Sequence, residues 1–160
     1  MLGAVDDRGV EQRSLFRRWP TGVSIVVAEA GGRRAGLTVN SLVSLSLDPP
    51  LVGISLALSA SLYEVLRAAE TWSVSMLAGD QAHLARHFAR SVPPLLQWDD
   101  IAVRDDDRHL LAGATGWLRA RTVDEIAAGD HTVFVGEVTT IEQGPGRGAL
   151  VYFGRDFHSL

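Results

Sequence analysis

Apolar and polar residues alternate along the stretch from Gly36 to Leu56, which predicts two adjoining strands. From Leu42 to Leu47, apolar residues alternate with serines or with Val43. Asp48-Pro49-Pro50 then removes two backbone donors and ends that strand before a second apolar run, Leu51 to Leu56. The pattern therefore predicts two strands joined by a rigid corner.

Small polar side chains occupy this frame, namely Thr38, Asn40, Ser41, Ser44 and Ser46. They offer hydrogen bonds without bulk, and so they leave room for a flat ligand. An antiparallel sheet with one face in water gives the same pattern. These residues alone are thus compatible with a binding surface and with an ordinary solvated sheet face.

A hairpin precedes this stretch. Val23 to Val27 is a β-branched strand, Gly31-Gly32 is typical of a turn, and Arg34 to Val39 is the returning strand. Thr38 and Asn40 are two residues apart on an extended chain, so we expect their side chains to face the same side.

Helical spacing is found before and after these strands. Apolar residues recur at near-helical spacing from Val10 to Trp19, before Pro20, which predicts a helix that packs on the sheet. Leu62 to Ala69 predicts a second helix, with Ser61 and Glu64 as a capping box. Residues 82–88 predict a third, with Asp80 as its cap.

The remaining chain predicts further strands at Trp72 to Leu77, Gly116 to Val123 and Thr132 to Ile141. Gly144 to Gly148 is typical of a hairpin turn, after which residues 150–157 complete the sheet. The region from 91 to 107 has little periodicity, so we expect a long covering loop that shapes the mouth of a binding site.

Composition narrows the class of protein. At 160 residues and 46% hydrophobic content, the chain has the size of one compact domain. Its net charge of -4 argues against a nucleic-acid partner, and no apolar run is long enough to span a bilayer. Because the start is acidic rather than a signal peptide, we expect a cytoplasmic protein. Without cysteine, any redox chemistry requires a bound cofactor.

Common nucleotide and hydrolase motifs are absent from the sequence. There is no G-x-G-x-x-G fingerprint, no Walker loop and no nucleophile elbow. His83 and His87 are four residues apart on the predicted third helix, but a metal needs at least one more ligand, so no metal site is expected.

Ser61 and His131 each allow two interpretations. Ser61 either only caps its helix or stands where free amides at the helix start bind an anion. His131, at the start of a predicted strand, is either a hydrogen-bonded structural group or a group that contacts a ligand.

Three motifs occur in order along the chain. They are Phe16-Arg17-Arg18 to Thr21-Gly22-Val23, Thr38-Val39-Asn40-Ser41 through Asp48-Pro49-Pro50-Leu51-Val52, and Gly129-Asp130-His131 through Val138. In order and spacing they resemble the flavin reductase-like family, whose members have the FMN-binding split-barrel fold. A closing strand, Leu150 to Phe153, is also similar, and the likeness covers roughly residues 12 to 158.

This resemblance implies a mainly β protein, an antiparallel split β-barrel with flanking short helices. Residues 10–160 would form the flavin reductase-like domain after a flexible N-terminus of residues 1–9. It also implies a homodimer with flavin near the subunit interface. The implied activity is reduction of FMN or FAD by NADH or NADPH, supplying reduced flavin to a partner monooxygenase.

The same resemblance assigns site residues. The flavin would lie along Thr38, Val39, Asn40, Ser41, Ser44, Leu45, Ser46 and Pro50, largely against backbone groups. Ser59 and Ser61 would meet its phosphate, and Arg155 would stand at the mouth. His131 would be the catalytic residue that places the nicotinamide, with Asp130 orienting its ring. Hydride transfer needs positioning rather than a protein base.

The sequence departs from the family pattern at two places. Ser59-Ala60-Ser61-Leu62 stands where the family usually has Arg or Lys followed by Ser-Ser-Thr, so the basic residue is missing. Arg33, Arg34, Arg86 or Arg90 could supply that charge instead. Phe157 stands where members often have tyrosine.

Two alternatives to the reductase remain open. The chain could be a non-enzymatic split-barrel protein that binds flavin or haem as an electron carrier, which the missing basic residue favours. It could also be a dimeric barrel that has lost its cofactor.

Overall fold

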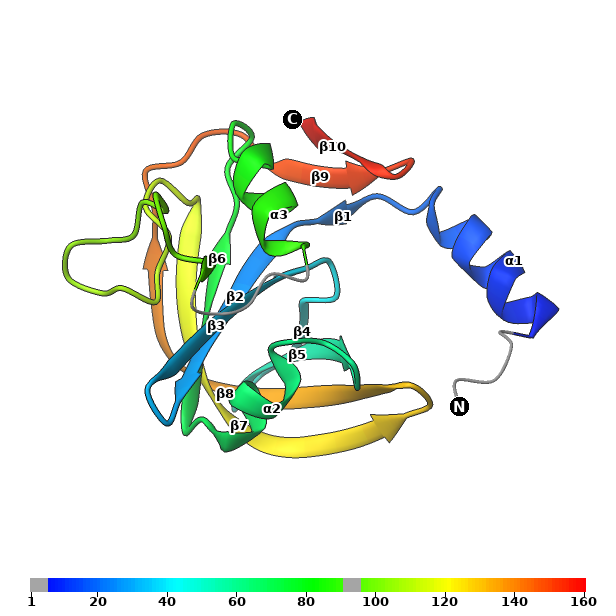
Figure 1. Cartoon of the computed structure of the whole chain (residues 1–160), viewed down its shortest axis with the longest axis horizontal. Helices are drawn as coiled ribbons and strands as arrows, with labels where there is room; N and C mark the ends of the chain where they lie inside the picture. Colours follow the sequence, from blue (N-terminus) through cyan, green and yellow to red (C-terminus); the bar gives the residue numbers. More distant parts are fainter. Residues whose placement is uncertain (1–5, 91–95) are drawn as a thin grey trace.

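A computed structural model of the chain describes residues 6–90 and 96–160, and it is dominated by antiparallel strands (Figure 1). The elements in chain order are α1 (Asp7–Phe16), β1 (Thr21–Gly22), β2 (Ser24–Ala30), β3 (Arg33–Val39), β4 (Val43–Leu47), β5 (Pro50–Ala57), α2 (Tyr63–Ala68), β6 (Thr71–Met76), α3 (Ala82–Phe88), β7 (Gly116–Ala128), β8 (His131–Gln143), β9 (Leu150–Phe153) and β10 (Asp156–Ser159).

Seven strands form one antiparallel sheet in the order β3-β2-β6-β7-β8-β5-β4. Its two edge strands, β3 and β4, are joined only by residues 40–42. Four residue steps reach at most about 14 Å, whereas the edges of a flat seven-stranded sheet would lie about 29 Å apart. The sheet must therefore roll up so that its edges approach at this end, as a split barrel requires.

The predicted hairpin is confirmed as β2 and β3, which pair from Ser24↔Val39 to Ala30↔Arg33. Gly31 and Gly32 form the turn with φ of +57° and +74°, the left-handed conformation that a two-residue hairpin turn needs. The two strands joined by the Asp48-Pro49-Pro50 corner are confirmed as β4 and β5.

Strand β2 is buried on both faces, which explains its β-branched sequence. Val26 and Ala28 belong to a core cluster inside the rolled sheet, together with Leu66 of α2. Ile25 and Val27 belong to a second cluster on the other face, closed by α3. Both helices therefore cover the sheet where the β2–β3 hairpin lies.

The covering-loop prediction for residues 91–107 is supported for its described part, residues 96–107. The Gln97 side chain is fully buried and bonds both the amide and the carbonyl of Gly36, each at 3.1 Å. Trp98 donates its indole N–H to the Arg34 carbonyl at 3.1 Å. This segment covers β3 rather than the cleft beside Asn40 described below.

A small separate sheet, β1-β9-β10, closes the chain. The predicted strand at Leu150 to Phe153 is confirmed as β9, but the expected hairpin turn before it is wrong. Residues 144–148 instead connect β8 of the large sheet to β9 of the small one, because β9 pairs with β1 and β10.

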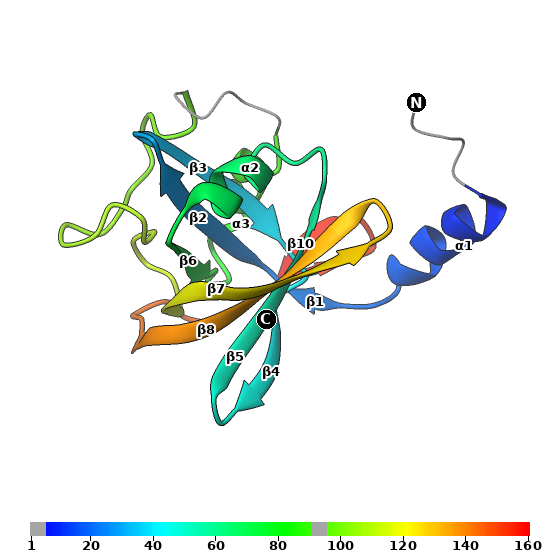
Figure 2. The same ribbon diagram turned by 90° about the horizontal axis from the view of Figure 1, so that it is seen from below.

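Helix α1 does not pack on the sheet, contrary to the sequence prediction. It has no buried residue, and Leu15, Phe16 and Trp19 are more than half exposed. Figures 1 and 2 show α1 extending away from the sheet at one side of the molecule. The apolar residues are present as predicted, but no part of the chain that the structure describes buries them. Asp7 to Gly9, expected in the flexible terminus, form the first turn of α1, and residues 1–5 lie outside the described residues.

Both predicted helix caps are wrong. The residue at the N-cap of α2 is Leu62, not Ser61, and that of α3 is Gln81, not Asp80; neither side chain caps its helix. Gln81 Oε1 instead accepts from the amide of Ala78 at 2.9 Å. Among the residues that the structure describes, no helix is both long and apolar enough to cross a bilayer.

Candidate functional site

Ser41 binds the connection between β3 and β4 to β5 through hydrogen bonds. Its hydroxyl donates to the Ser55 carbonyl and accepts from the Ser55 amide, both at 3.0 Å. The Ser41 side chain thus takes the place of a β-strand backbone beside Ser55, at a point of β5 that β4 does not reach. This double bond fixes the backbone of residues 40–42 beside the C-terminal half of β5.

His131 lies on the other side of the same part of β5. Ala57, the last residue of β5, pairs with His131, and the Leu58 amide donates to the Asp130 carbonyl at 3.0 Å. Ser55, which Ser41 holds, is only two residues from Ala57. Ser41 and His131 therefore flank one end of β5 from its two neighbouring sides.

A tight turn leads from this end of β5 into α2. The Ala60 amide donates to the Ala57 carbonyl at 2.9 Å, and the Tyr63 amide donates to the Ala60 carbonyl at 3.0 Å. Ser59 is exposed and Ser61 is half-buried on this turn. The structure thus brings the residues expected at the flavin phosphate close to those expected at the nicotinamide.

Asp130 orients the imidazole of His131. Its Oδ1 lies 2.6 Å from His131 Nδ1, and the two side chains are 81% and 43% exposed. The hydrogen bond from His131 lowers the pKa of Asp130, and the positive charge of Arg13 on α1 adds to this effect. An ionised carboxylate only accepts hydrogen bonds, so Nδ1 carries the proton toward Asp130. The Nε2 atom takes no part in this contact.

A cleft of about 570 Å³ adjoins Asn40 and Ser41. Its walls include β1, the start of β2 and the end of β6, with Trp19 at its edge. Thr21 lines this cleft, and its hydroxyl is buried without a hydrogen-bond partner among the described residues. A buried hydroxyl without a partner is uncommon, so it suits a site where a ligand supplies the missing bond.

Other residues assigned to the flavin lie apart from this group. Thr38 donates its hydroxyl to the Ala85 carbonyl of α3 at 2.6 Å, and Val39 is buried in the core. Thr38 and Asn40 were expected to face the same side because both were placed on one extended strand. That strand, β3, ends at Val39, so Asn40 lies outside it. Arg155 is exposed on the β9–β10 turn with φ of +73°.

The β4–β5 hairpin carries the rest of the assigned set, Ser44, Leu45, Ser46 and Pro50. Ser44 pairs with Val52, five residues before Ala57, so these residues run along the hairpin away from His131. The Leu45 side chain lies over Gly53, where an added Cβ would meet it at 3.0 Å. Figure 2 shows this hairpin projecting from the body of the molecule.

Two of the arginines considered for the missing basic residue are engaged elsewhere. The Arg34 guanidinium lies 3.8 Å from the centre of the Trp98 ring, and Arg86 pairs with Asp156 at 3.0 Å. A further arginine, Arg67 of α2, is also engaged, because it donates to Glu125 of β7 at 3.0 Å. The sequence analysis did not single out Thr21, although Thr21 belongs to a motif that carried the resemblance.

No cluster of three potential metal ligands occurs among the residues of 6–90 and 96–160. Of the two spaced histidines on α3, His83 is exposed and His87 Nε2 lies 2.7 Å from the Gln97 carbonyl. His87 therefore helps to hold the covering loop.

Comparison with known proteins defines the class to which this fold and site belong. Residues 16–160 match the model of the flavin reductase like domain. The chain therefore belongs to the flavin reductase-like family, which confirms the resemblance and the split-barrel fold read from the sequence.

Named relatives are similar over most of the chain. An NADH:FMN oxidoreductase of Rhodococcus qingshengii is 36% identical over 82% of this chain and 69% of its own length. The reductase component of 4-hydroxyphenylacetate 3-monooxygenase of Thermus thermophilus is 34% identical over 92% of this chain and 94% of its own. The solved NADH:FAD oxidoreductase of Streptomyces globisporus has a TM-score of 0.87 at 35% identity, covering 100% and 97% of the two chains.

Proposed function

We propose that this protein is an NADH- or NADPH-dependent reductase of FMN or FAD. The observation that carries the proposal is the meeting of Ser41, Ser59, Ser61 and the Asp130–His131 pair around one end of β5, in a chain of the flavin reductase-like family. The names of its relatives, NADH:FMN and NADH:FAD oxidoreductases, support the same activity.

The residues present fit a flavin. Exposed Ser59 and half-buried Ser61 would donate to its phosphate, and the backbone held by Ser41 would lie against its ring system. Thr21, whose buried hydroxyl lacks a partner among the described residues, would donate to a polar atom of a ligand in the adjoining cleft. Bound flavin supplies the two-electron chemistry.

His131 would hold the nicotinamide. With Nδ1 bonded to Asp130, its Nε2 can bond a carboxamide and so restrict the orientation of the second substrate. Hydride transfer requires the two reacting atoms to be held about 3 to 3.5 Å apart, so the contribution of His131 is positional. No protein group needs to take up a proton in this step.

The homodimer is also part of the proposal. Large apolar side chains are exposed on α1 and the segment that follows it, on β4 and on β7: Leu15, Phe16, Trp19, Leu45, Leu47 and Ile126. Figure 2 shows α1, the β4–β5 hairpin and the β7–β8 turn standing out from the body. Apolar surface of this kind is covered in self-complementary contacts of symmetric dimers. A second copy would cover it and place flavin near the interface.

A partner monooxygenase is the proposed consumer of the reduced flavin. The printed name of the Thermus thermophilus relative is that of a monooxygenase reductase component. Ser59 and Ser61 lack a neighbouring fixed cation on their turn, which favours a flavin that binds and leaves over one held permanently. The expected cytoplasmic location stays a prediction.

The competing function is a flavin- or haem-binding electron carrier, which the absence of a basic residue at Ser59 favours. One experiment separates the two. Purified protein is mixed with FMN or FAD and with NADH or NADPH, and the absorbance of the reduced nicotinamide is followed. Rapid catalytic loss supports the reductase. Retained flavin or haem without that loss supports the carrier and contradicts our proposal, as does the absence of both.

A further inference from the structure

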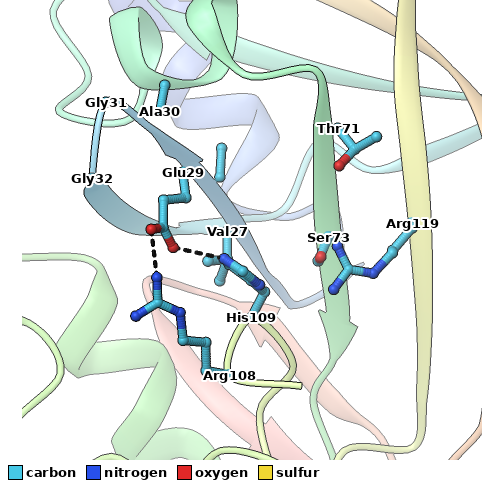
Figure 3. A pocket seen from close by; sticks show the side chains of 11 residues that line it. Val27, Glu29, Ala30, Gly31, Gly32, Thr71, Ser73, Arg108, His109 and Arg119 are labelled. Atoms are coloured by element: carbon cyan, nitrogen blue, oxygen red, sulfur yellow. Dashed lines mark hydrogen bonds and ion pairs between the residues drawn. The ribbon is translucent and has the colours of Figure 1, made fainter. Parts of the chain in front are cut away.

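A second, polar cavity of about 390 Å³ lies under the loop that carries Arg108 and His109 (Figure 3). Its floor is a row of side chains on one face of three adjacent strands. Val27 of β2 pairs with Ser73 of β6, and Ser73 pairs with Arg119 of β7, so these side chains stand side by side. The cavity is thus built from the sheet itself and closed by the loop.

This cavity is separate from the candidate flavin site. None of its lining residues lines the cleft of Thr21 and Asn40. It lies at the Ala30 end of β2, by the Gly31-Gly32 turn, whereas the cleft lies at the Ser24 end. Six residue steps along the strand separate the two ends, a distance of about 20 Å.

Ser73 has an unsatisfied hydroxyl in this cavity. The residue is 1% exposed, and its Oγ has no hydrogen-bond partner among the described residues. Ser75, two residues further on the same face, accepts from the Leu111 amide at 3.0 Å. The loop therefore satisfies Ser75 but leaves Ser73 unpaired where it lines the cavity. A buried donor of this kind points to a partner that the chain does not supply.

The carboxylates near the cavity already have their partners. Glu29 accepts from Arg108 at 2.5 Å and from His109 Nε2 at 2.8 Å. Asp107 accepts from the His109 amide at 2.9 Å and from Arg119, and its Oδ1 lies 3.1 Å from His109 Nδ1. Because His109 Nε2 faces Glu29, it is not placed to act as a base on Ser73.

After these carboxylates are paired, hydrogen-bond donors of the cavity remain without an acceptor among the bonds described above. Each guanidinium has five N–H groups, and Arg108 and Arg119 each use only one in the bonds above. The Ser73 hydroxyl adds another donor. A ligand that satisfies them must bring acceptor oxygens, and the planar guanidinium favours the oxygens of a carboxylate or phosphate.

We propose that this cavity binds a small anion that carries a carboxylate or phosphate group, with Ser73 and Arg119 at its floor and Arg108 at its mouth. The cavity volume falls within the range of small-molecule pockets. Arg108 is 61% exposed, whereas Arg119 is 29% exposed, so an anion can enter past the first and reach the second. The proposal does not depend on the reductase activity.

The test uses inorganic phosphate and acetate as separate probes, with sodium chloride at matched ionic strength. The purified full chain is titrated while its Tm and the ¹⁵N chemical shifts of residues 71–73 and 107–109 are followed. Saturable shifts at these amides with phosphate, acetate or both support the site, and their relative strength tells which group it prefers. Shifts with neither probe, or equal shifts with chloride, overturn it.

Variants locate the site. Ser73→Ala removes a hydroxyl with no partner among the described residues, so it leaves the fold intact and should weaken probe binding about tenfold. Arg119→Gln should weaken probe binding at least as much. Arg121→Gln is the matched control, because Arg121 lies two residues along β7, pairs with Glu137 and does not line the cavity. Unchanged binding in Ser73→Ala, or equal loss in the control, would contradict the proposal.

Discussion

The hydroxyls of Tyr63 and Thr132 lie 2.9 Å apart, and both residues are buried. This bond joins α2, which follows the turn of Ser59 and Ser61, to the strand residue directly after His131. Either atom can donate, because each is a hydroxyl. This buried contact adds to the backbone bond between Leu58 and Asp130 in holding the two halves of the candidate site together.

Replacing Tyr63 with phenylalanine should lower the free energy of unfolding by about 1–3 kcal/mol, because Thr132 is left with an unpaired buried hydroxyl. Denaturant unfolding of Tyr63→Phe measures this change. The double variant Tyr63→Phe/Thr132→Val should recover part of the loss, since no unpaired group remains. If the two single losses simply add, the hydrogen bond does not contribute as described.

His131→Ala should weaken the use of NADH or NADPH about tenfold or more while it leaves flavin binding nearly unchanged. The reason is that His131 would contact only the nicotinamide, with its Nε2 atom. Steady-state kinetics at varied nicotinamide, together with a flavin titration followed by fluorescence, measures the two effects. Equal loss of both, or no loss of either, would count against the assigned role.

Asp130→Asn tests the positioning part of that role. The asparagine amide of this variant could still face the imidazole, but without a carboxylate it no longer fixes Nδ1 as the donor. We expect a smaller rise in the KM for the nicotinamide than in His131→Ala, with flavin affinity retained. Glu64→Gln, which removes an exposed carboxylate on α2, is a matched control for loss of one negative charge. A control variant with the same rise would exclude a specific effect of Asp130.

Local patterns in the sequence predicted much of the fold. The β2–β3 hairpin follows from β-branched residues around Gly31-Gly32, and β4 and β5 follow from alternation around Pro49-Pro50. The strand order could not be predicted from such patterns, because pairs such as Ala57↔His131 join residues far apart in the chain. Whether α1 packs on its own sheet also depends on the tertiary structure, which its apolar spacing does not reveal.

The candidate site was predictable where a motif carried it, as at Ser41 and His131. It was not predictable where the role of a residue depends on its neighbours in space. The Thr38 hydroxyl bonds a carbonyl of α3, and Ser61 lies one residue before the N-cap of α2. Thr21 was part of a matched motif, but only the structure shows that its hydroxyl lacks a partner among the described residues.

The cluster of Glu29 and Asp107 predicts a dependence of stability on pH. The hydrogen bond from His109 lowers the pKa of Glu29 below its ordinary value of 4.5. Burial raises the pKa of Asp107, but the hydrogen bonds from Arg119 and His109 and the charge of Arg119 together outweigh burial, so that pKa is also lowered. A lowered pKa in the folded state stabilises the fold above the unfolded pKa, and this stabilisation is lost as pH falls through the folded pKa.

We therefore expect the free energy of unfolding to fall as the pH is lowered from about 5 toward 3. Glu29→Gln should be less stable than the parent at pH 6 and should lose less stability over that interval. Urea unfolding at several pH values measures both slopes. Asp124→Asn, which removes an exposed carboxylate of β7, is the control and should keep the parent slope. A Glu29→Gln slope equal to that of the parent would show that Glu29 does not contribute.

The exposed apolar residues of α1 and of the segment between α1 and β1 predict the response of the proposed homodimer to substitution. Leu15 and Trp19 are 67% and 64% exposed, so a glutamate at either position costs a lone chain little stability. If a second copy covers them, Leu15→Glu and Trp19→Glu bury a charge at the interface and should weaken association at least tenfold.

Sedimentation equilibrium measures the association of the Leu15→Glu and Trp19→Glu variants, and flavin titration shows whether flavin binding weakens with it. Leu96→Glu is the matched control, because Leu96 is 56% exposed and belongs to the covering loop, a segment that Figure 1 shows on the side of the molecule opposite α1. We expect the control to remain dimeric. A parent protein that is monomeric at all concentrations would contradict the dimer, and dimers unaffected by both substitutions would place the interface away from α1.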